Sequence, residues 1–158
     1  MIVTCTVFIA ACNPEKSGES KVTNVSFQSD LVALARIINL PFQPDSVKWQ
    51  TASLVTNKSQ SFGPEDWGIV VLMKISDKDF KSFMEGAQDT KSASLPAAFA
   101  LPWLSSMITS EFRLDTSGSY YEFTRSAVSA EAFYRSPLLN GAIFPVSSTE
   151  LLLYLHTQ

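Results

Sequence analysis

One apolar run in the middle of the chain constrains the fold more than any other feature. Residues Trp67 to Ser76, WGIVVLMKIS, are continuously apolar in their middle. Successive side chains of a strand point to opposite faces of a sheet, so a strand that is apolar at every position is covered on both faces. We therefore expect this segment to be a central strand with a packed layer on each side.

A helix is predicted directly after this strand, over SDKDFKSFMEG. Ser76, with Asp79 three residues later, makes a start like a capping box. The apolar side chains between Phe80 and Met84 share one helical face, and Gly86 is typical of a helix end. This strand-to-helix joint is the best-defined local prediction in the sequence.

Other patterns predict further elements around this pair. Helical spacing predicts a helix that Ser29 or Asp30 begins and Pro41 ends, and a shorter helix over PWLSSMITSEF. Alternation predicts a strand over DSVKWQTASL, and one or two strands are expected over YYEFTRSAVSAEAFYRSP. Asn140-Gly141 is the strongest short hairpin signal, and a last strand should run from Glu150 to His156.

The mixture of helices and hairpins predicts one α+β domain over residues 25–158, an antiparallel sheet with two or three helices packed on it. A chain of 158 residues is long enough for one ordinary domain. Apolar residues make up 46% of it, with 11 Phe and 3 Trp, which is enough to build a substantial core.

The N-terminal residues have the character of an export signal. Residues 1–11, MIVTCTVFIAA, carry no charge and are shorter than the roughly 20 residues of a membrane-spanning helix. Ile9-Ala10-Ala11-Cys12 resembles the lipobox of bacterial lipoproteins, in which small residues precede a cysteine. The resemblance implies that residues 1–11 are a signal peptide and that Cys12 receives a diacylglycerol that holds the protein on a membrane.

The residues after Cys12 fit the same layout. Residues 12–24 are polar, rich in Ser, Lys and Glu, and predict a flexible tether. Asn13 at the position after the cysteine favours the outer membrane, facing the periplasm. A lipoprotein signal begins with Lys or Arg, so we expect the natural start to lie upstream of Met1. The alternative is a buried first strand, because IVTCTVFIA is rich in β-branched residues.

Charge and residue inventory argue against several classes of protein. The net charge is −3 without a cluster of basic residues, so a nucleic-acid partner is not expected. Cys5 and Cys12 form no metal-binding pattern, and His156 is the single histidine of the sequence. Because a Ser-His-acid set needs a placed histidine, we predict no catalytic residue, metal or cofactor, and interpret His156 as a surface residue at a strand end.

Two acidic stretches are candidate sites. Glu65 and Asp66 precede Trp67, and two carboxylates beside an aromatic ring are typical of a carbohydrate cleft. The alternative is a Gly-Pro turn in which Asp66 fixes the backbone and Trp67 enters the core. Asp77 and Asp79 belong to an acidic run that is either the solvated face of a helix or a surface for a basic partner.

Paired tyrosines form a third candidate, in SGSYYEF. Because neighbours on a strand face opposite sides, one of Tyr120 and Tyr121 should point to water. An exposed tyrosine is a common anchor in protein interfaces. The alternative is a tyrosine half-buried at the rim of a sheet.

These observations favour a lipid-anchored envelope protein that is not an enzyme and that binds an unidentified protein. The subclass that fits best is an inhibitor or immunity protein against an envelope-directed toxin or hydrolase. A second hypothesis is a periplasmic hydrolase or carbohydrate-binding domain centred on Glu65, Asp66 and Trp67. A third is a structural assembly factor of the envelope.

Overall fold

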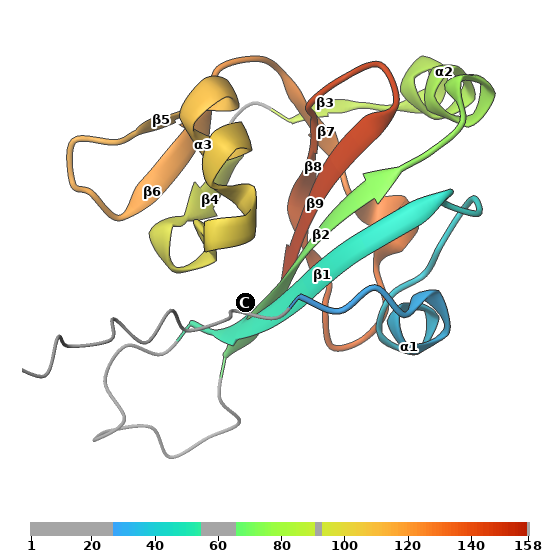
Figure 1. Cartoon of the computed structure of the whole chain (residues 1–158), viewed down its shortest axis with the longest axis horizontal. Helices are drawn as coiled ribbons and strands as arrows, with labels where there is room; N and C mark the ends of the chain where they lie inside the picture. The colour runs from blue at the N-terminus through green and yellow to red at the C-terminus, as the bar shows by residue number, and fades with distance from the viewer. Residues whose placement is uncertain (1–26, 55–65, 91–92, 158) are drawn as a thin grey trace, which may run out of the picture.

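A six-stranded antiparallel sheet forms the centre of the protein (Figure 1). The computed structural model describes residues 27–54, 66–90 and 93–157. The strands of this sheet lie in the order β1-β2-β9-β8-β7-β3, and a second sheet has the order β4-β6-β5. With three α-helices in the described residues, the chain is a single α+β domain, as the sequence predicts. The strands of the large sheet are β1 (Ser46–Ser53), β2 (Trp67–Lys74), β3 (Asp89–Thr90), β7 (Ala127–Ser129), β8 (Asn140–Pro145) and β9 (Glu150–His156).

The predicted central strand is β2. It pairs with β1 on one side and with β9 on the other, and both Val70 and Val71 are fully buried although they face opposite sides. The predicted last strand, Glu150–His156, is confirmed as β9. The apolar strands β2 and β9 therefore lie side by side in the middle of the sheet, where both faces must be covered by a packed layer.

One face of the sheet is covered by α1 (Leu31–Ile37) and α2 (Asp77–Gly86), as Figure 1 shows. Both helices begin as predicted: the Asp30 carboxylate accepts from the N–H groups of the first turn of α1, and the Ser76 hydroxyl accepts from the Asp79 N–H. The rings of Phe42, Phe83 and Phe133 meet edge to face in this layer.

The other face is covered by α3 (Ser105–Glu111) and by the small sheet of β4 (Ser94–Pro96), β5 (Phe112–Leu114) and β6 (Tyr120–Phe123). Short 3-10 helices at Ala97–Phe99 and Pro102–Leu104 join β4 to α3, and a third lies at Glu131–Phe133 on the opposite face. The rings of Phe112, Phe123 and Phe144 pack together here, so each face of the large sheet has its own aromatic cluster.

The hairpin predicted at Asn140-Gly141 is wrong, because both residues lie inside β8. Gly141 pairs with Leu155 of β9, and its φ is +144°. A Cβ at this position would lie 2.0 Å from the backbone oxygen of Tyr154. Gly141 therefore allows β8 and β9 to approach each other closely, and it does not form a turn.

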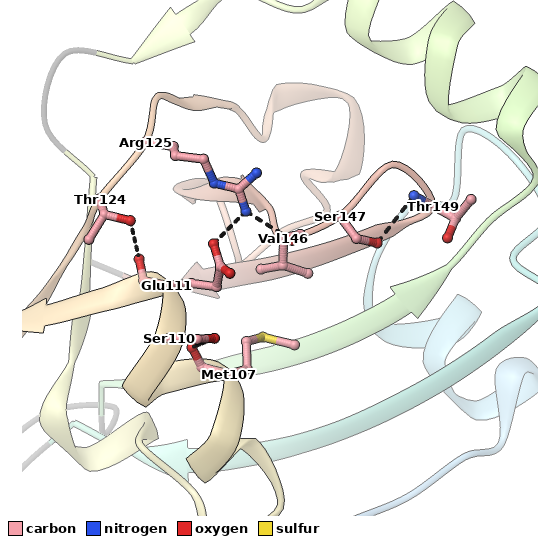
Figure 2. A network of polar contacts seen from close by, with 8 residues as sticks. All are labelled: Met107, Ser110, Glu111, Thr124, Arg125, Val146, Ser147 and Thr149. Atoms are coloured by element: carbon pink, nitrogen blue, oxygen red, sulfur yellow. Dashed lines mark hydrogen bonds and ion pairs between the residues drawn. The ribbon is translucent and has the colours of Figure 1, made fainter.

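Arg125 links the small sheet to the large one (Figure 2). Its guanidinium pairs with the Glu111 carboxylate at the end of α3, and it donates a 2.9 Å hydrogen bond to the Val146 carbonyl beyond β8. The guanidinium also lies over the Phe123 ring, 5.3 Å from its centroid.

Candidate functional site

The hairpin formed by β5 and β6 extends from the body of the protein at the left of Figure 1. Its turn is organised by Asp115, whose carboxylate accepts hydrogen bonds from the N–H groups of Ser119 at 2.9 Å and Tyr120 at 3.0 Å. The Ser117 hydroxyl donates to the other carboxylate oxygen. Gly118 supplies the left-handed backbone of the turn, with a φ of +72°. The turn of this β5–β6 hairpin (Phe112–Phe123) is therefore held by hydrogen bonds within the hairpin itself.

The electrostatics of the turn agree with this arrangement. The Ser117 hydroxyl and the Tyr120 N–H donate to the Asp115 carboxylate, and they hold its pKa below the ordinary value of 3.8. Hydrogen bonds to the charged form of a carboxylate favour that form. Asp115 is accordingly ionised, and its hydrogen bonds are in place, at neutral pH.

Two large apolar side chains are exposed next to this turn. Leu114 is 48% exposed on β5, and Tyr120 is 48% exposed on β6. Leu114 pairs directly with Tyr121, so Leu114 and Tyr120 lie on opposite faces of the β5–β6 hairpin. A partner with a cleft could therefore contact both of them at once.

The prediction for the paired tyrosines is confirmed in its geometry. Tyr120 is the member that points to water, and Tyr121 packs against the apolar cluster between the two sheets. Alternation along β6 is the physical reason.

A pocket of about 630 Å³ adjoins the Tyr120 side of the β5–β6 hairpin. We call it the tyrosine pocket. Its lining includes residues from four separate segments of the chain: Asp66, Pro96, Ser119 with Tyr120, and Tyr154 with His156. Its volume lies within the range of about 300–1,000 Å³ that is usual for small-molecule sites.

Tyr154 forms the inner wall of this pocket and is only 5% exposed. Its ring is 5.0 Å from the Phe99 ring and stacks on the His156 ring at 5.2 Å. Gly68 leaves room for this stack, because a Cβ there would lie 2.9 Å from Phe99 Cζ and 3.1 Å from Tyr154 Cε2. Burial, and to a smaller extent the Tyr120 phenol, raises the pKa of Tyr154 above its ordinary range. The Tyr154 hydroxyl therefore stays protonated at neutral pH.

The predicted acidic and aromatic stretch is divided between two sides of the sheet. Asp66 lines the tyrosine pocket and accepts a 3.3 Å hydrogen bond from the Thr157 hydroxyl. Trp67 packs against the helix-covered core instead, because it alternates with Gly68 along β2. Glu65 lies outside the described residues, as does Cys12.

Asp77 and Asp79 lie in the first turn of α2, on the face of the large sheet opposite to the tyrosine pocket. Asp79 accepts a 2.7 Å hydrogen bond from the Ser76 hydroxyl. Carboxylates at a helix N-terminus stabilise the helix through its dipole. The structure therefore does not bring these two acids together with Asp66 or Tyr120.

Sequence reasoning did not identify Tyr154 and Pro96 as lining residues. Tyr154 lies in LLLYLH, and a single polar-tipped ring in an otherwise apolar strand is the signal that could have found it. Pro96 pairs with Tyr120 across β4 and β6, a relation that depends on tertiary pairing.

Within the described ranges, no three His, Cys, Asp or Glu side chains gather where they could hold a metal ion. None of the helices in that part of the chain combines the length and the apolar character needed to cross a membrane. Comparison of the chain with protein-family models, with curated proteins and with solved structures found no match.

Proposed function

We propose that this protein is a non-enzymatic protein-binding module, held on the bacterial envelope by a lipid on Cys12, whose β5–β6 hairpin contacts the partner. The observation that carries the proposal is the Asp115 network, which fixes a hairpin that exposes Leu114 and Tyr120. A segment that is ordered before binding loses less conformational entropy when the complex forms. Tyrosine is also enriched among the residues that dominate binding energy.

The placement of the two side chains suggests the kind of partner. Leu114 and Tyr120 lie on opposite faces of the β5–β6 hairpin, so a flat surface could contact only one of them. A concave partner would enclose both, and enzymes present their active sites in clefts. This geometry favours an inhibitor or immunity protein that inserts the hairpin into an envelope-directed toxin or hydrolase.

The proposed location rests on the lipobox-like residues and on the polar tether of residues 12–24. Asn13 favours the outer membrane, with the domain facing the periplasm. Intact mass spectrometry of the native protein tests this part: a chain that begins at an acylated Cys12 is expected. An unmodified chain that begins at Met1 would contradict the lipid anchor.

Affinity capture from detergent-solubilised membranes tests the binding surface. Tyr120→Ala and Leu114→Ala should each reduce the recovery of one stoichiometric partner about tenfold, since each removes an anchor worth more than 1 kcal/mol. Leu139→Ala is the matched control, because Leu139 is 52% exposed but lies outside the β5–β6 hairpin. Equal capture by all three variants, or capture of no protein by the wild type, would count against the proposal.

A further inference from the structure

Beyond the proposed protein binding, we propose that the tyrosine pocket binds a sugar ring of a neutral oligosaccharide. The pocket combines a partly exposed aromatic ring, an apolar wall and several hydroxyl groups. A pyranose has the matching surfaces, because its C–H groups form an apolar face and its hydroxyls surround the ring.

The aromatic and apolar parts of the pocket are Tyr120, Pro96 and the residues that follow Pro96. Tyr120 is 48% exposed and Pro96 is its direct partner across the two strands. Ala97 and Ala98 continue this wall with small side chains. Together they leave an open ring face beside an apolar surface, on which a sugar ring can pack.

The polar part is arranged for hydroxyl groups. Tyr154 lines the pocket, and its hydroxyl makes no hydrogen bond with any residue that the structure describes. This hydroxyl is therefore available to donate to, or accept from, a ligand in the pocket. The Asp66 carboxylate, which already accepts from Thr157, has further capacity to accept, and Ser119 adds a hydroxyl.

The charged side chains that line the pocket indicate whether its ligand is neutral or anionic. The described lining contains one carboxylate, that of Asp66, and neither Lys nor Arg. Phosphate and carboxylate ligands are recognised mainly by Arg and Lys, so an anionic ligand does not fit these residues. A neutral ligand that both donates and accepts hydrogen bonds satisfies Tyr154, Ser119 and Asp66 together.

The test uses the full chain in detergent and three neutral trisaccharides as probes: chitotriose, cellotriose and maltotriose. At least one should bind with a dissociation constant of about 1 mM or below and shift the NMR signals of Tyr120 and Tyr154. Tyr154→Phe keeps the ring stack and removes only the hydroxyl, and it should weaken binding about fivefold or more. Tyr121→Phe, which removes a phenol on the other face of β6, should leave binding unchanged.

Leu114→Ala separates this inference from the proposed protein binding, because Leu114 does not line the tyrosine pocket. It should reduce partner capture and leave trisaccharide binding intact. If none of the three trisaccharides shifts the Tyr120 or Tyr154 signals, the inference is wrong. It is also overturned if Tyr154→Phe abolishes partner capture and no sugar binds, since the pocket would then receive a side chain of the partner.

Discussion

The carboxylate of Asp115 accepts a hydrogen bond from the backbone N–H of Tyr120, which lies five residues further along the chain, at 3.0 Å. This contact closes the turn and places the exposed Tyr120 ring at the start of β6. The proposed interface therefore depends on a side chain that need not touch the partner itself.

Asp115→Ala should loosen the β5–β6 hairpin while the two aromatic clusters of the core stay intact. We expect faster hydrogen exchange at the Tyr120 amide and a severalfold weaker capture of the partner, because ordering the hairpin then costs entropy on binding. Asp77→Ala is the control, since it removes an exposed acid from α2 on the other side of the sheet. Unchanged exchange at Tyr120 in the Asp115 variant would show that the carboxylate does not hold the turn.

The pH dependence of the hairpin follows from the lowered pKa of Asp115. A carboxylate with a lowered pKa in the folded state contributes stability above its ordinary pKa, and this contribution is lost as the pH falls through the folded value. The Ser119 and Tyr120 amide signals should therefore titrate with a midpoint below 3.8 and show no transition near neutral pH. NMR titration measures this directly, and a midpoint at or above 3.8 would contradict the assigned hydrogen bonds.

Gly68→Ala should lower the free energy of unfolding by about 1–3 kcal/mol, because the added methyl group would lie 2.8 Å from the Leu155 carbonyl oxygen and would also meet the Phe99 and Tyr154 rings. Gly86→Ala provides the control: no atom lies within 4 Å of its Cβ position. That substitution should leave stability unchanged or raise it by up to about 1 kcal/mol. Urea denaturation distinguishes the two, and equal effects would mean that neither the approach of β9 nor the ring stack requires a glycine at position 68.

Arg125→Ala should lower the free energy of unfolding by about 1 kcal/mol, and Glu111→Gln by about 0.5 kcal/mol or less. Both side chains are partly exposed, which limits the strength of the ion pair. Arg125 additionally loses its hydrogen bond to the Val146 carbonyl and its contact with the Phe123 ring. Urea denaturation at low and high salt checks the difference: a larger loss for Glu111→Gln would contradict this account of the junction.

Much of the large sheet could be predicted because its signals are local. The apolar run of β2, the capping residue Ser76 and the strand Glu150–His156 each occur within about ten residues of sequence, and each is confirmed. The small sheet was not predicted as a separate sheet, because its strands have only three or four residues and are defined by pairing with one another. The hairpin predicted at Asn140-Gly141 is wrong for the same reason, because the role of Gly141 depends on Tyr154 in a neighbouring strand.

The candidate sites could likewise be predicted only where they depend on residues that are close in sequence. Alternation correctly predicted that one of the paired tyrosines faces water, since this depends only on neighbours along β6. The tyrosine pocket joins Asp66, Tyr120 and Tyr154, which lie far apart in the sequence, so no local pattern could assemble it. Asp66 and Trp67 are adjacent in sequence, yet they belong to different surroundings in the fold.

Site-specific photocrosslinking in intact cells of the source organism tests the central claim most directly. A photoreactive phenylalanine replaces Leu114 on the β5–β6 hairpin in one chain and Leu139, which has similar exposure, in another. The account predicts one discrete crosslinked protein from position 114 and none from position 139. Identical products from both positions, or no product from position 114, would contradict binding through the hairpin.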